Sequence, residues 1–286
     1  MYCFAYYVVP PPTSGTIIVT KHVASPANAT QAFTFEGNIS YTADHTFQLA
    51  VSNGADASMT FYGRGVDAVD PRLRSALARQ FAARLELLQG GARRIGWKLG
   101  MGEAERIGRE VALGYLTSAS VVSARSTWMA GRDAALHADA ELALEMAQHV
   151  TSDADDAALR DAVGGYGTAL EIVDLGDAPK GPEAVVADNV FHRAVAFGRF
   201  HREMPAGSTN GRLVVNGEVR ATAPVDVDVA ARVRAVARLL EAMGEQLRRG
   251  DRLITGSVVQ VAIRPGDKVV ADLGHLGDVA VSIAPE

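Results

Sequence analysis

The sequence predicts an α+β fold with a mixed or antiparallel sheet, preceded by a small all-β segment. Runs of β-branched or alternating residues, which are typical of strands, outnumber the helical repeats. These runs do not alternate regularly with helices, as they would in a doubly wound α/β protein. The composition, 48% hydrophobic and 21% charged over 286 residues, is that of a folded globular chain.

The first segment differs in composition from the rest. Ten of the eighteen aromatic residues precede Gly63, and all 24 arginines follow it. We therefore predict two parts, residues 1–63 and residues 64–286, joined near Gly63. Four strand-like runs predict a small β-sandwich in the first part, at 15–23, 31–35, 46–51 and 57–62. Its GTIIVTKHV and FTFEG sequences loosely resemble the prealbumin-like repeats of bacterial surface proteins.

Three helices are expected in the second part. The first begins at Asp70-Pro71 and ends at Gly90-Gly91, with a stripe of Leu73, Leu77, Phe81, Leu85 and Leu88. The others cover 152–163 and 228–249, and the last ends at Gly250. We interpret the glycines at 164–167 as a helix stop, because they do not open a helix and so do not form a phosphate-binding loop.

Six further runs predict strands in the second part, at 141–146, 168–173, 212–220, 252–257, 268–273 and 278–283. Together with the helices, they favour a mixed sheet over a βαβ arrangement.

The charge and cysteine content exclude some classes of function. The formal net charge of −5 argues against a nucleic-acid-binding surface. A single cysteine excludes internal disulfides and a cysteine cluster for zinc. No apolar stretch approaches the roughly 18 residues of a membrane span, so we expect a soluble, cytoplasmic protein without a membrane partner.

Acidic residues alternate with apolar ones between residues 139 and 146. Period two places Asp139, Glu141 and Glu145 on one face of a strand. Neighbouring carboxylates repel when ionised, and a divalent cation would turn that repulsion into attraction. The alternative is a half-exposed edge strand with its acids in water. Glu171 favours the metal interpretation, because it lies inside an apolar strand-like run where an unpaired acid is rare.

Five motifs in register resemble those of the fumarylacetoacetate hydrolase superfamily. They are RRIGWKLG, DAELAL, ALEIVD, VADN and DRLITGS, and the resemblance covers residues 70–286. The chain is most similar to the 2-keto-4-pentenoate hydratase and 4-oxalocrotonate decarboxylase branch. The resemblance implies a mixed β-roll or sandwich with flanking helices, and a homo-oligomer. It also implies a Mg²⁺ or Mn²⁺ ion held by Asp139, Glu141 and Glu171, with Asp139 in place of the first glutamate of the family pattern.

The same resemblance implies roles for two further side chains. Lys98 matches the active-site lysine of the family, and Ser257 matches a hydroxyl that contacts the substrate carboxylate. A lysine at a strand end with its amine in solvent, and a simple turn serine, are the alternatives. The chain departs from the pattern at Ala112, where the family has an acid, and at Phe191, where it has a serine. His192, beside the missing serine, is a candidate replacement acid or base.

The expected reaction follows from the chemistry of 2-oxo acids, whose carboxylate and ketone oxygens chelate a divalent ion. We expect a metal-dependent lyase acting on a small 2-oxo-enoate, a hydratase or a decarboxylase in aromatic-compound catabolism. A carbon–carbon hydrolase or oxaloacetate-type decarboxylase is the alternative within the superfamily. A catalytically degenerate binding protein is the alternative outside it.

Overall fold

The computed structural model describes residues 17–21, 31–36, 46–51, 57–61, 73–101, 111–131, 134–176, 181–204 and 209–286. Described residues of the ranges 73–240 and 246–286 belong to one compact unit, and the four amino-terminal strands belong to another. The predicted junction near Gly63 and the predicted helix start at Asp70-Pro71 lie outside the described residues. The division at residue 63 therefore stays a prediction.

The four strands expected in the first segment are present. β1 (Ile17–Lys21) pairs antiparallel with β4 (Ala57–Phe61), and β2 (Gln31–Glu36) pairs antiparallel with β3 (Thr46–Val51). The described part of this segment is thus entirely β. Its resemblance to prealbumin-like repeats stays a prediction.

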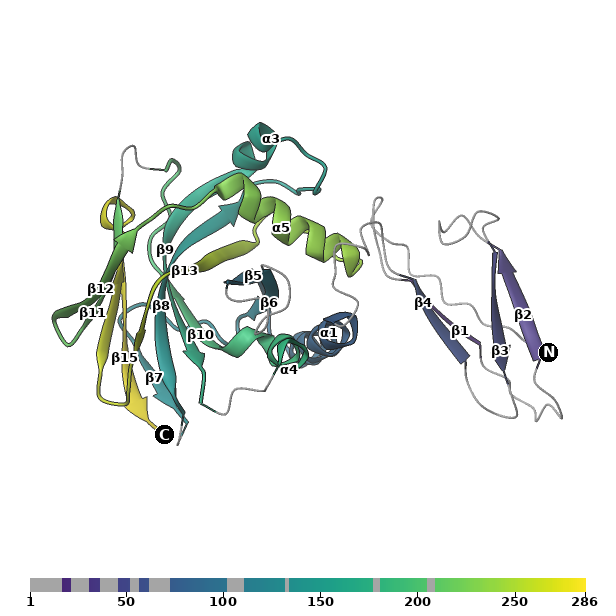
Figure 1. Cartoon of the computed structure of the whole chain (residues 1–286), viewed down its shortest axis with the longest axis horizontal. Coiled ribbons are helices and arrows are strands. Elements are labelled where there is room, and N and C mark those ends of the chain that lie inside the picture. The colour runs from purple at the N-terminus through teal and green to yellow at the C-terminus, as the bar shows by residue number, and fades with distance from the viewer. Residues whose placement is uncertain are drawn as a thin grey trace. The chain divides into compact units, whose positions relative to one another are not determined.

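Two mixed sheets form the larger unit (Figure 1), which confirms the predicted α+β class. In the six-stranded sheet, β13 runs parallel to β5 and the other neighbours are antiparallel. Its order is β10 (His192–Phe197), β9 (Val163–Asp174), β8 (Leu136–Met146), β13 (Arg252–Ala262), β5 (Arg94–Met101) and β6 (Val111–Thr117). The five-stranded sheet has the order β12 (Glu218–Pro224), β11 (Asn210–Val215), β14 (Lys268–Asp272), β15 (Asp278–Pro285) and β7 (Thr127–Ala130).

One face of β8 and β9 is packed against the five-stranded sheet. Strands β11, β14 and β15 contact β8 or β9. The Thr168 hydroxyl on β9 donates a hydrogen bond of 2.7 Å to the carbonyl of Gly277, just before β15. Leu142 lies opposite Thr168 on β8 and is fully buried on this face. Since side chains alternate along a strand, the odd-numbered residues of β8 and β9 point to the opposite side of the sheet.

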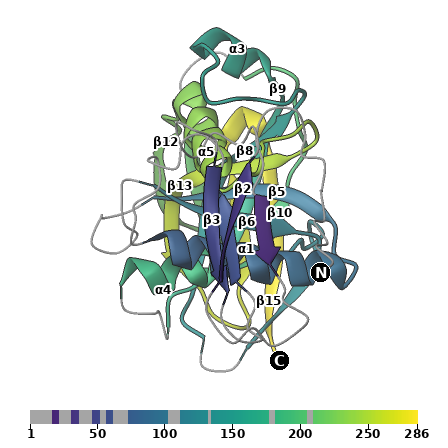
Figure 2. The same ribbon diagram turned by 90° about the vertical axis from the view of Figure 1, so that its right-hand side faces the viewer.

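The first helix, α1 (Arg74–Gln89), packs against α4 (Pro182–Ala187) and β6, as the two views in Figures 1 and 2 show. Its buried face differs from the predicted leucine stripe, because Leu85 is 53% exposed. Polar residues take part in the buried face instead. Gln80 donates hydrogen bonds to the carbonyls of Leu113 and Val186, and the Arg84 guanidinium lies 4.6 Å from the ring centre of Trp97. These contacts accompany the burial of two side chains that periodicity alone assigns to solvent.

The other two predicted helices are shorter than expected. α3 (Asp156–Asp161) is capped by the Asp155 carboxylate, and β9 already begins at Val163. The glycines at 164–167 therefore lie in a strand, not at a helix stop. α5 (Val229–Ala242) ends before Gly244, which has a φ of 71°. That left-handed conformation is incompatible with continuing the helix to residue 249.

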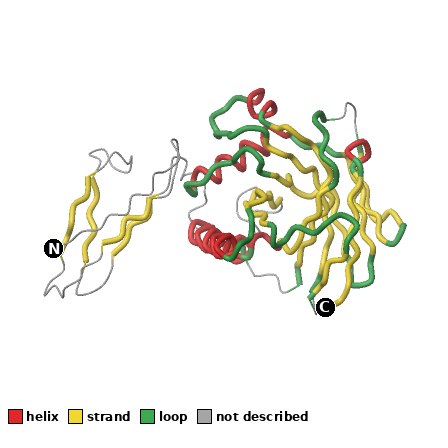
Figure 3. Tube along the Cα trace, turned by 180° about the vertical axis from the view of Figure 1, so that it is seen from behind, coloured by secondary structure: helices red, strands yellow, loops and turns green. Residues whose placement is uncertain are grey.

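The run expected as one strand at 212–220 is a hairpin of β11 and β12. Asn216 and Gly217 have φ values of 53° and 87°, as the two central residues of a tight hairpin turn require. Other strands are present where none was predicted, namely β5, β6, β7 and β10. Figure 3 shows how strands predominate over helices. Within the described ranges, no helix combines the length and the apolar character needed to cross a bilayer.

Candidate metal centre

Three carboxylates converge on the side of the six-stranded sheet that faces away from the second sheet. One oxygen from each of Asp139, Glu141 and Glu171 lies within 4.8 Å of the other two. The residues are only 5%, 1% and 1% exposed, respectively. β8 is an interior strand, flanked by β9 and β13. The interpretation as an edge strand with its acids in water is therefore wrong, whereas the predicted convergence of the three acids is confirmed.

Strand register explains this convergence. Asp139 and Glu171 are direct partners in the antiparallel ladder between β8 and β9. Glu141 follows Asp139 by two residues and so shares its face. Glu145 lies on the same face but is partly exposed and contacts Arg252. The predicted series of acids thus divides into a buried group and a solvated residue.

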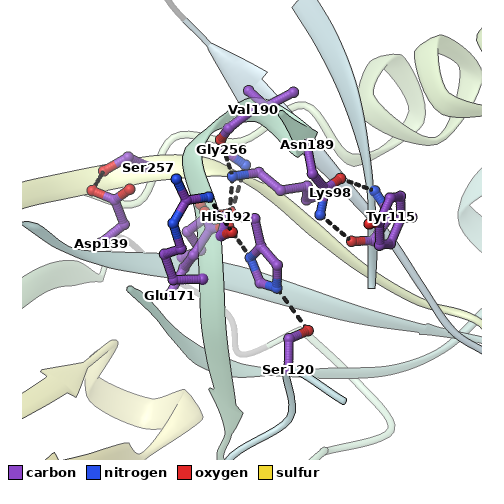
Figure 4. A network of polar contacts seen from close by, with 12 residues as sticks. Lys98, Tyr115, Ser120, Asp139, Glu171, Asn189, Val190, His192, Gly256 and Ser257 are labelled. Atoms are coloured by element: carbon purple, nitrogen blue, oxygen red, sulfur yellow. Dashed lines mark hydrogen bonds and ion pairs between the residues drawn. The ribbon is translucent and has the colours of Figure 1, made fainter. Parts of the chain in front are cut away.

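An irregular stretch of β13 supplies two polar contacts to these acids. The pairing with β8 shifts register on both sides of Ser257, which marks β-bulges at this point. The Gly256 amide donates a hydrogen bond of 2.8 Å to Glu141 Oε2. The Ser257 hydroxyl donates one of 3.1 Å to Asp139 Oδ1 (Figure 4). Gly256 has a φ of 101°, which glycine adopts without the strain that a side chain would cause.

Lys98 lies in the middle of β5 and is 2% exposed, so its amine does not reach into solvent from a strand end. Its Nζ atom lies 2.5 Å from Glu171 Oε1 and donates to the carbonyl of Val190 at 3.0 Å. An ammonium carries three hydrogens, so these two partners leave one for another acceptor. Lys98 is the only cationic side chain among the described residues that line the neighbouring cavity.

The electrostatic environment shifts the pKa values of the three acids in different directions. Burial, together with the nearby Glu171 carboxylate, raises the pKa of Asp139 to about 7. Burial and the two other carboxylates raise the pKa of Glu141 well above its usual value. Burial also opposes ionisation of Glu171, but Lys98 and His192 outweigh it and lower its pKa to about 2. Without a further cation, Asp139 and Glu141 are therefore harder to ionise than in water.

One wall of the site includes Val190 and Phe191, which share an uncommon backbone conformation with the preceding Asn189. Asn189, Val190 and Phe191 all have φ between 53° and 64°. The Asn189 side chain accepts a hydrogen bond from the amide of Tyr115 and donates one to its carbonyl. Burial is the largest of the effects that raise the pKa of Tyr115. A Cβ atom on Gly100 would come within 2.4 Å of Val190 Cγ1, so a glycine there lets β5 approach this wall.

A cavity of about 380 Å³ adjoins the carboxylates. Its polar lining comprises Lys98, the three acids, Ser257 and Gln260, and its apolar lining includes Leu99, Val173, Leu175, Val190 and Phe191. Ser257 and Gln260 are exposed to solvent. The volume lies in the range of small-molecule sites. A larger hollow of about 620 Å³ lies between α1 and β6 and contains none of the candidate site residues.

The structure brings all five predicted site residues together, namely Lys98, Asp139, Glu141, Glu171 and Ser257. It also adds contacts that sequence reasoning missed. His192 binds Glu171, and Gly256 binds Glu141. Asn189 binds Tyr115 and so fixes the segment that precedes Val190. Two features of the sequence hinted at these contacts. One is the histidine that follows Phe191, where the chain departs from the family pattern, and the other is the glycine of the Thr-Gly-Ser segment. Ala112 is buried opposite Gly100 and supplies no acid.

The donor set fits a hard divalent cation. Carboxylate oxygens are the ligands that Mg²⁺, Mn²⁺ and Ca²⁺ prefer. With all three acids ionised and Lys98 protonated, the cluster carries two uncompensated negative charges. Burial lowers the pKa of His192 despite its contact with Glu171, so this residue does not cancel the excess. Two positive charges would balance the cluster.

Several solved structures share the fold of this chain. 4-Oxalocrotonate decarboxylase from Pseudomonas putida G7, complexed with magnesium and adipate, has a TM-score of 0.62 at 21% identity, covering 73% of this chain and 84% of that chain. Fumarylpyruvate hydrolase from Pseudomonas aeruginosa, in complex with Mn²⁺ and pyruvate, has a TM-score of 0.52 at 20% identity, covering 68% and 90%. 2-Hydroxyhepta-2,4-diene-1,7-dioate isomerase from Mycobacterium marinum has a TM-score of 0.52 at 17% identity, covering 68% and 75%.

No curated protein matches the sequence. The family model described as fumarylacetoacetate (FAA) hydrolase C-terminal matches residues 101–284. This match contains four of the five predicted site residues, all except Lys98. The chain therefore belongs to the fumarylacetoacetate hydrolase family.

Proposed function

We propose that this chain is a divalent-cation-dependent enzyme acting on a small 2-oxo acid, and that its reaction is of the lyase type, hydration or decarboxylation. The observation that carries the proposal is the buried group of Asp139, Glu141 and Glu171, with oxygens within 4.8 Å of one another and one lysine against them. Three buried acids are costly to ionise unless a cation accompanies them. In this proposal the three acids hold Mg²⁺ or Mn²⁺.

The bound cation would supply positive charge to the carboxylate and ketone oxygens of the 2-oxo acid. The protein's own residues would orient that acid. Lys98 has one ammonium hydrogen left for a substrate oxygen, after Glu171 and Val190. The Ser257 hydroxyl donates to Asp139 and retains lone pairs that accept from a substrate or a water.

The apolar part of the cavity would hold the carbon chain of the substrate. Leu99, Val173 and Phe191 line this part. Apolar side chains displace water and so strengthen the interactions of Lys98 with bound anions. The substrate would enter from the side of the cavity where Ser257 and Gln260 are exposed to solvent.

Calorimetric titration of Mn²⁺ and Mg²⁺ tests the proposed site. Glu141→Gln removes one buried charge with little change in shape, and we expect it to abolish binding. Glu145→Gln is the matched control, because Glu145 lies on the same strand and face but is partly exposed and paired with Arg252. Equal binding by wild type and Glu141→Gln would refute the cation site.

Product analysis distinguishes the reactions. The purified protein with Mn²⁺ is offered 2-hydroxypentadienoate, 4-oxalocrotonate and an acylpyruvate, and products are identified by mass spectrometry. Hydration or decarboxylation of the first two supports the lyase proposal. Cleavage of the acylpyruvate alone would support a carbon–carbon hydrolase instead. Binding of pyruvate or oxalate without turnover of any substrate would support a binding protein, the alternative favoured by Ala112 and Phe191.

A further inference from the structure

His192 is a buried histidine whose two ring nitrogens both have partners. Nδ1 lies 2.6 Å from Glu171 Oε1, and Nε2 lies 2.8 Å from the Ser120 hydroxyl. The residue is only 6% exposed. Figure 4 shows the imidazole between the glutamate and the serine. Neither His192 nor Ser120 is among the described residues that line the carboxylate cavity.

A β-bulge brings His192 to this place. His192 pairs with Val173 and Ala194 pairs with Ile172, so Arg193 is an extra residue in β10. In a regular ladder His192 would lie opposite Asp174, and its side chain would point to the other face of the sheet. The extra residue turns the imidazole to the face that carries Val173 and Glu171.

We propose that His192 is a positioning residue, held by Ser120, which fixes the Glu171 carboxylate for cation binding. This inference rests on the proposed function, since it treats Glu171 as a cation ligand. It replaces the sequence-based expectation that His192 acts as an acid or base on the substrate. A side chain with both nitrogens engaged, outside the cavity lining, has no described route to a substrate proton.

The contacts define which nitrogen carries the proton. An ionised carboxylate only accepts hydrogen bonds, so the Nδ1–H group of His192 donates to Glu171. Lys98 Nζ contacts the same oxygen, Oε1, and neither contact uses Oε2. Two donors on one oxygen hold the carboxylate in a single orientation. Such outer partners typically orient a ligand and increase its affinity for a metal ion.

Ser120 supports the other side of the ring. Its hydroxyl lies 2.8 Å from Nε2 and 3.3 Å from the carbonyl of Thr117. With Nδ1 protonated in the neutral ring, Nε2 accepts, and the single serine hydrogen goes to the nearer of these two atoms. The carboxylate, imidazole and hydroxyl therefore form a chain that restrains rotation of the ring.

Two amide substitutions separate a positioning role from general packing. The side-chain amide of asparagine places its nitrogen where Nδ1 of histidine lies, whereas that of glutamine reaches the position of Nε2. We expect His192→Asn to keep a donor to Glu171 and to bind Mn²⁺ within about threefold of wild type. We expect His192→Gln and His192→Leu to bind about 10- to 100-fold more weakly, the usual effect of losing such a partner.

Calorimetry with Mn²⁺ alone measures these affinities, after circular dichroism has shown that each variant is folded. Ser120→Ala should lower the Mn²⁺ affinity less than His192→Leu, because it removes only the hydroxyl that holds the imidazole and leaves the donor to Glu171 in place. Binding by His192→Gln and His192→Leu at wild-type affinity would overturn the inference. An equal loss of Mn²⁺ affinity in His192→Asn and His192→Leu would also overturn the inference.

A measurement on the metal-free wild type does not depend on the variants or on the cation. Long-range ¹H–¹⁵N correlation spectra should show the His192 ring protonated at Nδ1, and an Nε2–H ring with bare Nδ1 would overturn the inference. Failure of the proposed function has a different signature. In that case wild type and Glu141→Gln both fail to bind Mn²⁺, while the Nδ1–H signal of His192 remains.

Discussion

Asp139 and Glu171 lie directly opposite each other on neighbouring antiparallel strands, both buried and both acidic. Like charges at directly opposed positions destabilise a sheet, and burial increases the cost. Lys98 contacts Glu171 and compensates one of these charges. The arrangement therefore destabilises the metal-free protein and favours cation binding.

Replacing Asp139 with asparagine should stabilise the metal-free protein while abolishing Mn²⁺ binding. The substitution removes a buried charge beside Glu171 and keeps an oxygen that can accept from Ser257. Residues of functional sites often lower the stability of the fold. We therefore expect the substitution to raise the free energy of unfolding by about 1 kcal/mol at pH 8. Urea unfolding in the presence of EDTA measures it. Glu145→Gln should leave the unfolding midpoint nearly unchanged, and a lower midpoint for Asp139→Asn would contradict the prediction.

The stability of the metal-free protein should depend on pH through Asp139. The pKa of this carboxyl is about 7 in the folded protein, against an ordinary value of 3.8 for an aspartate in water, so the folded chain binds the proton more tightly than the unfolded chain. This contribution is present below about pH 4 and is lost as pH rises to about 7. The difference in Tm between wild type and Asp139→Asn should therefore shift against wild type from about pH 5 to about pH 8. A difference independent of pH would show that Asp139 does not titrate in this window.

Lys98→Met should destabilise the protein more than Asp139→Asn stabilises it. The substitution removes the cation that contacts Glu171 at 2.5 Å in a buried site. Breaking a buried ion pair from one side typically costs about 3–5 kcal/mol. Thermal unfolding without metal measures the loss, and the double variant Lys98→Met with Glu171→Gln should recover part of it. Additive effects of the two substitutions would contradict a direct coupling.

Gly256→Ala should be more costly than the same substitution at Gly250. Both glycines have positive φ, of 101° and 85°, so both variants incur the left-handed penalty of about 1 kcal/mol. Nothing lies within 4 Å of a Cβ at Gly250, whereas a Cβ at Gly256 would lie 2.4 Å from Met101 Cγ. Displacement of the Gly256 amide would also weaken its bond to Glu141. Urea unfolding and Mn²⁺ titration of both variants provide the comparison, and equal losses would be inconsistent with it.

At Val190 we expect the glycine variant to be more stable than the alanine variant, the reverse of the usual order of stability. Val190 has φ 54° and ψ 50°, where glycine is favoured over alanine by about 1 kcal/mol. Val190→Gly should therefore unfold at a higher urea concentration than Val190→Ala. Val195 is a buried strand residue that provides the control, and there the alanine variant should be the more stable one. The same order at both positions would contradict the left-handed conformation at Val190.

Periodicity alone indicated that Asp139, Glu141 and Glu145 share a face, but the choice of Asp139, Glu141 and Glu171 as the site acids came from the family resemblance, and the surroundings of these acids were not predicted. Alternation along β8 places Asp139 and Glu141 on one face, and an isolated acid in an apolar run identifies Glu171. Both signals are local properties of a strand. The contact between His192 and Glu171 depends on a β-bulge, which pairs residues distant in the sequence and leaves no local pattern.

The errors in the predicted helices have a related cause. Leu85 fits a helical stripe, yet Gln80 and Arg84 occupy the buried face because β6, α4 and Trp97 offer them partners. Tertiary contacts of this kind override an apolar repeat. The missed hairpin is different, because Asn216-Gly217 is a recognised turn signal. Here local sequence held enough information to divide the expected strand at 212–220 into two.

The Asn189 side chain has a consequence for the solubility of the folded protein. Among the described strands, β6 is the last one of its sheet, and Asn189 binds both the amide and the carbonyl of Tyr115 on this strand. An open strand edge is a template on which another polypeptide can add a strand, which is a route to aggregation. The loop that shapes the cavity thus also blocks this edge at Tyr115 against intermolecular strand addition.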